Sequence, residues 1–107
     1  VALTEDDSAR PGFAVPVYAF FPEDRPVPAA APPLFAVHAA DDRTVPAAHS
    51  IRLFQMWRQA RRPAELHVFE SGGHGFGMRR QGKPADGWTD RLRDWLAAQG
   101  MLATARR

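Results

Sequence analysis

Two stretches of similar design decide the fold of this chain. The first is Leu34–Pro46, with the sequence LFAVHAADDRTVP, and the second is Ala64–Gly77, with the sequence AELHVFESGGHGFG. Each begins with an apolar run typical of a buried strand in a parallel sheet. Each then enters a polar loop, which carries two carboxylates in the first stretch and an imidazole among glycines in the second. Because the carboxyl ends of parallel strands meet at one edge of a sheet, the pattern predicts an acid and a base near each other.

Helical patterns follow both stretches. A helix is expected from Pro46 to about Arg61, ended by Pro63, and proline is well suited to a first helical turn. A second helix is expected over residues 86–99, with a stop at Gly100. Its tryptophans and leucines recur at the spacing of a core-facing stripe: Trp88, Leu92, Trp95 and Leu96. A helical crossover makes the two strands parallel, with a right-handed connection.

A third strand is expected upstream, over Phe13–Phe20. Pro16 interrupts this run, and proline prefers sheet edges because it cannot donate to a ladder. The fold class predicted is therefore α/β, with three parallel strands and flanking helices. The expected organisation is an extended lead-in (residues 1–12), a partial α/β domain (residues 13–102) and a frayed tail (residues 103–107).

Composition excludes several classes of function. The chain has 107 residues, a net charge of +2 and no cysteine, so disulfides, thiol catalysis and zinc–thiolate sites are ruled out. The basic residues occur in pairs such as Arg79-Arg80 and not as a stripe with interleaved aromatics, so no nucleic-acid partner is expected. No apolar run approaches the ~20 residues of a membrane span, so no membrane partner is expected. The compartment stays open.

The two stretches, extended to residues 33–46 and 64–77, resemble the C-terminal third of α/β-hydrolase esterases. Acetyl-xylan and feruloyl-type esterases are the most similar branch, near dienelactone hydrolases and prolyl oligopeptidases. The resemblance covers residues 11–102. It implies the C-terminal portion of an α/β-hydrolase sheet, a Ser-His-Asp triad, a small ester substrate, and neither a cofactor nor a metal.

The resemblance assigns roles by position. Asp42 lies four residues after His38 and three before Val45, which is the family's place for the triad acid, and Asp41 is the alternative. His74 would be the general base, taking a proton from a serine and returning it to the leaving alcohol. The structural alternatives are a turn-capping aspartate and a turn histidine without a catalytic task.

The nucleophile departs from the family pattern. No Gly-x-Ser-x-Gly elbow occurs in the sequence, and the serines are Ser8, Ser50 and Ser71. Ser71 is the one conceivable local substitute. The nucleophile is therefore expected outside this chain, as are the oxyanion-hole donors.

Two other functions remain open. One is a non-catalytic remnant or interaction module that retains only the acid and the base. The other is metal-dependent hydrolysis by a cluster of His38, Asp41, Asp42 and His74, although their spacing matches no strong metal motif.

The remaining expectations concern packing and assembly. His38 is expected to be a satisfied strand-end residue, whereas Phe76 and Met78 could line a pocket or pack in the core. Because the strand Phe13–Phe20 would lack a neighbour on one side, the chain is expected to form homo-oligomers or to need a missing N-terminal segment.

Overall fold

The computed structural model describes residues 12–21 and 25–101. In chain order its elements are strand β1 (Leu34–Ala39), helix α1 (Ala48–Gln59), strand β2 (Ala64–Phe69), a 3-10 helix (Pro84–Gly87) and helix α2 (Trp88–Ala98). The two strands are parallel, and their register runs from the pair Leu34–Ala64 to the pair Ala39–Phe69. The α/β class predicted from the sequence is confirmed.

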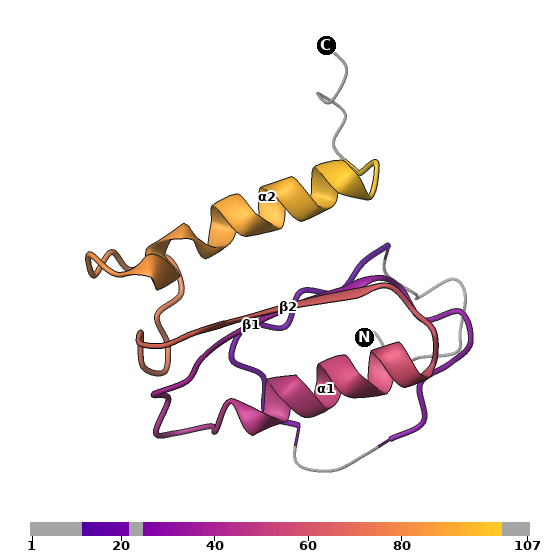
Figure 1. Cartoon of the computed structure of the whole chain (residues 1–107), viewed down its shortest axis with the longest axis horizontal. Coiled ribbons are helices and arrows are strands. Elements are labelled where there is room, and N and C mark those ends of the chain that lie inside the picture. The colour runs from indigo at the N-terminus through magenta and orange to yellow at the C-terminus, as the bar shows by residue number, and fades with distance from the viewer. Residues whose placement is uncertain (1–11, 22–24, 102–107) are drawn as a thin grey trace.

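Strand β1 lies at the centre of a layered structure. Figure 1 shows α1 on one side of the strands and α2 on the other. Every residue of β1 is buried, as its continuous apolar sequence predicts. Its residues alternate between two cores because successive side chains of a strand point to opposite faces. The core with α2 contains Phe35, Val37, Trp88 and Trp95. The core with α1 contains Leu34, Ala36, Leu53 and Trp57.

The third strand predicted over Phe13–Phe20 is not confirmed. This segment makes only two isolated parallel bridges to β1, which pair Ala14 with Leu34 and Val17 with Val37. The cause is Pro16, which accepts a bond from the Val37 N–H through its carbonyl but has no N–H to donate in return. The Phe35 carbonyl therefore lacks the partner that a regular ladder would provide. The segment still follows the edge of β1 and places Tyr18 at the carboxyl end of the sheet.

Both helices end close to the predicted positions. After α1, Arg61 takes a left-handed conformation (φ 61°) and the Arg62 N–H bonds to the Trp57 carbonyl at 3.0 Å, a Schellman pattern. Gly100 ends α2 in the same way, with φ 75°. The start of the last helix differs from the expectation. Residues 84–87 form a 3-10 turn before the α-helix begins at Trp88.

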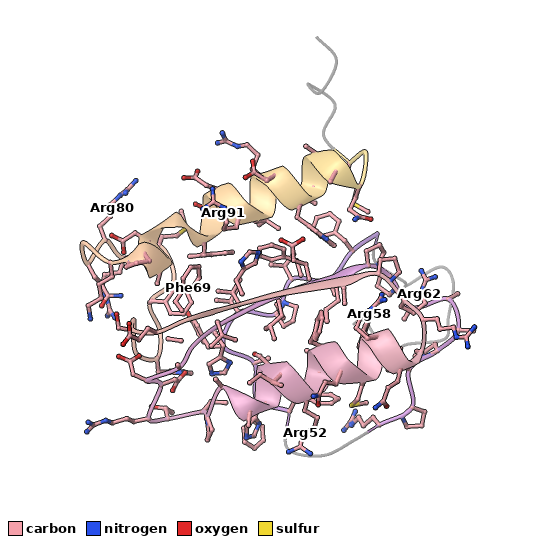
Figure 2. The ribbon with its side chains drawn as sticks, viewed as in Figure 1. Arg52, Arg58, Arg62, Phe69, Arg80 and Arg91 are labelled. Carbon is pink, nitrogen blue, oxygen red and sulfur yellow. The ribbon has the colours of Figure 1, made fainter. Side chains whose placement is uncertain are left out.

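The outer surface and the chain ends complete the description. Figure 2 shows labelled arginines on both sides of the molecule, with Arg52 and Arg58 beside α1, Arg91 on α2 and Arg80 on the loop before the 3-10 helix. Within the described residues, neither helix has the length and apolar character needed to cross a membrane. The predicted frayed tail, and all of the predicted lead-in except Gly12, lie outside the described residues.

Candidate active site

The loops that follow β1 and β2 meet at one edge of the sheet. Asp41 and Asp42 follow β1, and His74 lies five residues after the end of β2. The Nδ1 atom of His74 lies 2.8 Å from Oδ2 of Asp42, although 32 residues separate them in the sequence. The parallel register of the strands produces this contact, because it brings both carboxyl ends to the same level.

The two partners differ in exposure, as an acid–base pair requires. The Asp42 side chain is fully buried, whereas 35% of the His74 side chain is exposed. Since a carboxylate only accepts, Nδ1 of His74 donates and Nε2 is left with its lone pair in the neutral ring. No group among residues 12–21 and 25–101 hydrogen-bonds to this Nε2 atom. The imidazole can therefore accept a proton from outside the pair.

Two backbone N–H groups hold one oxygen of the Asp42 carboxylate. Its Oδ1 atom accepts the N–H groups of Thr44 and Val45, both at 2.8 Å. Burial alone would raise the pKa of Asp42. The backbone N–H of Val45, the hydrogen bond and charge of His74 and the N–H of Thr44 outweigh burial and lower this pKa. The carboxylate is thus kept ionised beside the imidazole.

The neighbouring acid, Asp41, has a different contact. Its Oδ1 atom accepts the backbone N–H of Gly73 at 2.8 Å, which ties the end of the β1 loop to the loop that carries His74. Of the two carboxylates that the sequence left open, Asp42 is the one that contacts the His74 ring. Asp41 instead fixes the backbone beside His74.

The glycines around His74 shape its loop. Gly72 has φ 153° and packs so closely that a Cβ there would lie 3.3 Å from Cβ of Ala85 and 3.4 Å from Cβ of Ala39. Gly73 and Gly75 also have positive φ, 70° and 76°. The sequence-based interpretation that glycines allow a sharp bend here agrees with these angles.

Sequence reasoning missed Tyr18. Its ring packs against that of His74 with a centroid separation of 4.7 Å, and against that of Phe76 at 5.2 Å. Tyr18 also has φ 42°, a region that bulky residues rarely adopt. Its place in a proline-interrupted segment gave no signal of this contact, which depends on the path of that segment along β1.

Sequence reasoning predicted that the His38 ring would be satisfied but did not identify its partners. This ring is fully buried behind Asp42, and its Nε2 atom lies 3.2 Å from Oδ2 of that residue. The same Nε2 is 2.7 Å from the Val45 carbonyl, and Nδ1 is 2.7 Å from Oγ of Ser50. The expectation of a satisfied strand-end histidine is confirmed.

The structure places two of the three serines. Ser50 is fully buried against His38, and no hydrogen bond joins Ser71 to His74 in the described part of the chain. Ser8 lies outside the described residues. Neither described serine is therefore positioned to attack a substrate beside His74.

The sequence left open whether the acidic and histidine side chains hold a metal ion and whether Phe76 and Met78 line a pocket. Within the described ranges, no three His, Asp or Glu side chains are arranged to hold a metal ion. Phe76 is buried in the core with α2, whereas Met78 is 78% exposed.

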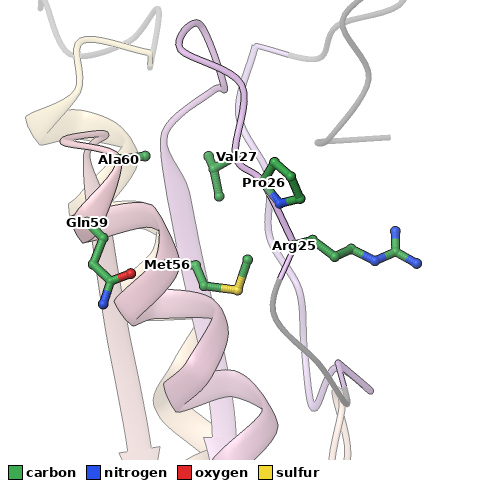
Figure 3. A pocket seen from close by; sticks show the side chains of 6 residues that line it. All are labelled: Arg25, Pro26, Val27, Met56, Gln59 and Ala60. Atoms are coloured by element: carbon green, nitrogen blue, oxygen red, sulfur yellow. The ribbon is translucent and has the colours of Figure 1, made fainter.

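A pocket of about 260 Å³ lies at the other end of α1. Its lining residues are Arg25, Pro26, Val27, Met56, Gln59 and Ala60. Figure 3 shows the Arg25 side chain extended away from the other five. Neither Asp42 nor His74 contributes to this pocket.

Comparison with known proteins gives a consistent result. A model of the prolyl oligopeptidase family matches residues 15–100. An α/β-hydrolase enzyme from a deep-sea metagenome library of the Medee basin is 23% identical, with a TM-score of 0.77 over 91% of this chain and 48% of that chain. An acetyl ester-xyloside bifunctional hydrolase from Caldicellulosiruptor lactoaceticus is 24% identical, with a TM-score of 0.77 over 88% of this chain and 44% of that chain. These two similarities show the α/β-hydrolase fold.

A third structure is more similar in sequence over a shorter region. A carboxylesterase from Lactobacillus plantarum is 31% identical, with a TM-score of 0.66 over 72% of this chain and 32% of that chain. From these coverages, the chain spans about half the length of the three solved structures or less. No protein of curated function matches the chain.

Proposed function

The chain belongs to the prolyl oligopeptidase family, and we propose that it supplies the acid and the base of a serine esterase. In this proposal Asp42 is the acid and His74 the base of a Ser-His-Asp triad, and the serine lies outside the 107 residues. The observation that carries the proposal is the 2.8 Å contact between a buried carboxylate and a half-exposed imidazole at the carboxyl edge of the sheet.

The chemistry follows from this contact. Nε2 of His74 takes the proton of the serine hydroxyl as the serine oxygen attacks the ester carbonyl. The imidazolium then gives that proton to the departing alcohol, leaving an acyl-serine that water hydrolyses by the same exchange in reverse. Asp42 holds the ring in the Nδ1–H tautomer and stabilises its positive charge in each step.

The substrate we propose is a small carboxylic ester, such as an acetylated or feruloylated sugar. Two observations support this substrate class. Residues 33–46 and 64–77 resemble esterases of this type, and the chain is similar to the acetyl ester-xyloside hydrolase.

The test compares the 107-residue chain with the longest reading frame that contains it, using p-nitrophenyl acetate. We expect activity only from a protein that includes a Gly-x-Ser-x-Gly segment, and a fluorophosphonate should label that serine. His74→Ala should lower kcat/KM by about 10²–10⁴-fold, and Asp42→Asn by up to about 10⁴-fold. His67→Gln is the matched control, because His67 lies on β2 and bonds to Glu65 instead.

One observation favours a second candidate, a non-catalytic interaction module. The sequence holds no nucleophile elbow, and neither described serine hydrogen-bonds to His74. An inactive longer protein would contradict the esterase and favour this alternative, whereas activity that survives His74→Ala would show that His74 is not the base.

A further inference from the structure

The His38 ring lies between Asp42 and Ser50. Its Nε2 atom is 3.2 Å from Oδ2 of Asp42, and its Nδ1 atom is 2.7 Å from Oγ of Ser50. Its ring is fully buried and bonds at both nitrogens. Because the Val45 carbonyl can only accept, the Nε2 atom of His38 carries a proton. In the neutral ring Nδ1 then accepts the hydroxyl proton of Ser50, at 2.7 Å. Ser50 and Val45 together therefore determine which way the ring faces.

The Nε2 atom of His38 also lies near the triad carboxylate, while its N–H is donated to the Val45 carbonyl. Oδ2 of Asp42 lies 3.2 Å from Nε2 of His38 and 2.8 Å from Nδ1 of His74. Both histidines thus approach a single oxygen, while backbone N–H groups occupy Oδ1. Val45 links the two groups, because its carbonyl accepts from His38 and its N–H donates to Oδ1 of Asp42.

We propose that His38 is a positioning residue for the reaction: it holds the Val45 backbone that donates to Asp42, packs 3.2 Å from Oδ2, and so maintains the Nδ1–H tautomer of His74. This inference rests on the proposed function. Ser50 acts one step further away by fixing the His38 ring. A purely structural role would leave the tautomer of His74 unaffected, whereas this geometry connects the His38 ring to the carboxylate that His74 uses, through Val45 and by its approach to Oδ2.

Three variants separate these roles. His38→Leu removes both ring nitrogens and keeps an apolar volume. His38→Gln keeps an amide N–H that reaches about as far as Nε2. Ser50→Ala leaves the His38 ring but removes the hydroxyl that fixes it. The control is His67→Leu, on the neighbouring strand, where the ring bonds to Glu65 and not to the triad.

The primary readout needs no turnover. ¹⁵N NMR of the 107-residue chain at alkaline pH reports which nitrogen of His74 carries the proton. We expect Nδ1–H in the parent chain, a shift toward Nε2–H in His38→Leu, a smaller shift in Ser50→Ala, and a parent-like spectrum in His38→Gln and His67→Leu. In the active longer protein, His38→Leu should lower kcat roughly tenfold or more at little change in KM, and His38→Gln should restore most of it.

Several outcomes would overturn the proposal. One is an unchanged His74 tautomer in folded His38→Leu, and another is a Gln variant as impaired as the Leu variant. If His38→Leu does not fold, a parent-like tautomer in Ser50→Ala overturns it instead. Absence of esterase activity in the longer protein would refute the proposed function alone, because the tautomer measurement stands without turnover.

Discussion

At the scale of single residues, the Asp42 carboxylate is held from two directions. It accepts two backbone N–H groups on one oxygen and is approached by two imidazoles on the other. Such a group resists protonation in the folded state. Its behaviour toward acid is therefore a direct readout of the site.

The lowered pKa of Asp42 predicts acid sensitivity. A carboxyl whose pKa is lower in the folded than in the unfolded state contributes stability above the unfolded value, about 3.9, and loses it as pH falls through the folded value. The free energy of unfolding from urea titrations should therefore fall as pH drops below about 4.

Substitution isolates the share of Asp42. Asp42→Asn should lower the free energy of unfolding at pH 7 by about 1–3 kcal/mol, because an amide nitrogen in place of Oδ2 could not accept the Nδ1–H of His74. The variant should also lose less stability on acidification than the parent. Asp86, whose pKa the backbone N–H of Gln81 lowers, accounts for the acid sensitivity that remains. Asp90→Asn, at an exposed position, is the control. If Asp90→Asn lost as little stability on acidification as Asp42→Asn, this account would be contradicted.

At the scale of elements, the loop after β2 is held by close backbone packing. Gly72 lies where a Cβ would meet Ala39 on β1 and Ala85 in the 3-10 helix at 3.3–3.4 Å, and its φ of 153° is strained for other residues. Gly82 has a positive φ of 73°, but nothing lies within 4 Å of a Cβ there. Gly82 thus has a positive φ without close contacts, whereas Gly72 has both.

We predict that Gly72→Ala lowers the free energy of unfolding by roughly 2–3 kcal/mol, compared with about 1 kcal/mol for Gly82→Ala. Gly72→Ala should also displace the His74 loop, so its esterase activity in the longer protein should fall further than that of Gly82→Ala. Urea unfolding monitored by tryptophan fluorescence measures the first effect. Equal losses of stability in the two variants would show that the contacts with Ala39 and Ala85 cost little.

Comparison with the sequence-based predictions shows what local pattern can reveal. The apolar run that begins at Leu34 was expected to form a buried strand and forms β1, because an unbroken apolar run is a strong signal. The placement of Asp42 and His74 at one sheet edge was also predictable, since a parallel crossover requires it. The ladder along Phe13–Phe20 was not, because whether Pro16 breaks the pairing depends on which neighbour its missing N–H would face.

The supporting contacts were beyond sequence reasoning for a different reason. The bond from His38 to Ser50 depends on how α1 is oriented over the sheet. The packing of Tyr18 on His74 joins side chains 56 residues apart, through a backbone turn with φ 42°. Neither arrangement has a periodicity or a motif, so neither produces a local signal.

At the scale of the whole molecule, the segment Phe13–Phe20, which runs along β1, leaves its own outer backbone edge open. Backbone groups of Ala14, Pro16 and Tyr18 bond to β1, so those of Val15 and Val17 point to the opposite side. No backbone hydrogen bond reaches them from elsewhere in the described residues. Phe20, at the end of this segment, is 69% exposed. An open strand edge beside exposed apolar surface favours association.

We therefore predict that the 107-residue chain self-associates through this edge, unless a segment from outside the chain covers it. Light scattering over a hundredfold range of concentration should show the mean mass rising, with slower hydrogen exchange at the amides of Val15 and Val17. Phe20→Lys should weaken association, because it places a charge beside the open edge. Met78→Lys, at a side chain that is 78% exposed on the His74 loop, is the matched control and should leave association unchanged. A monomer at all concentrations with cooperative unfolding would mean that this edge needs no partner, and that the two cores around β1 suffice to hold the fold.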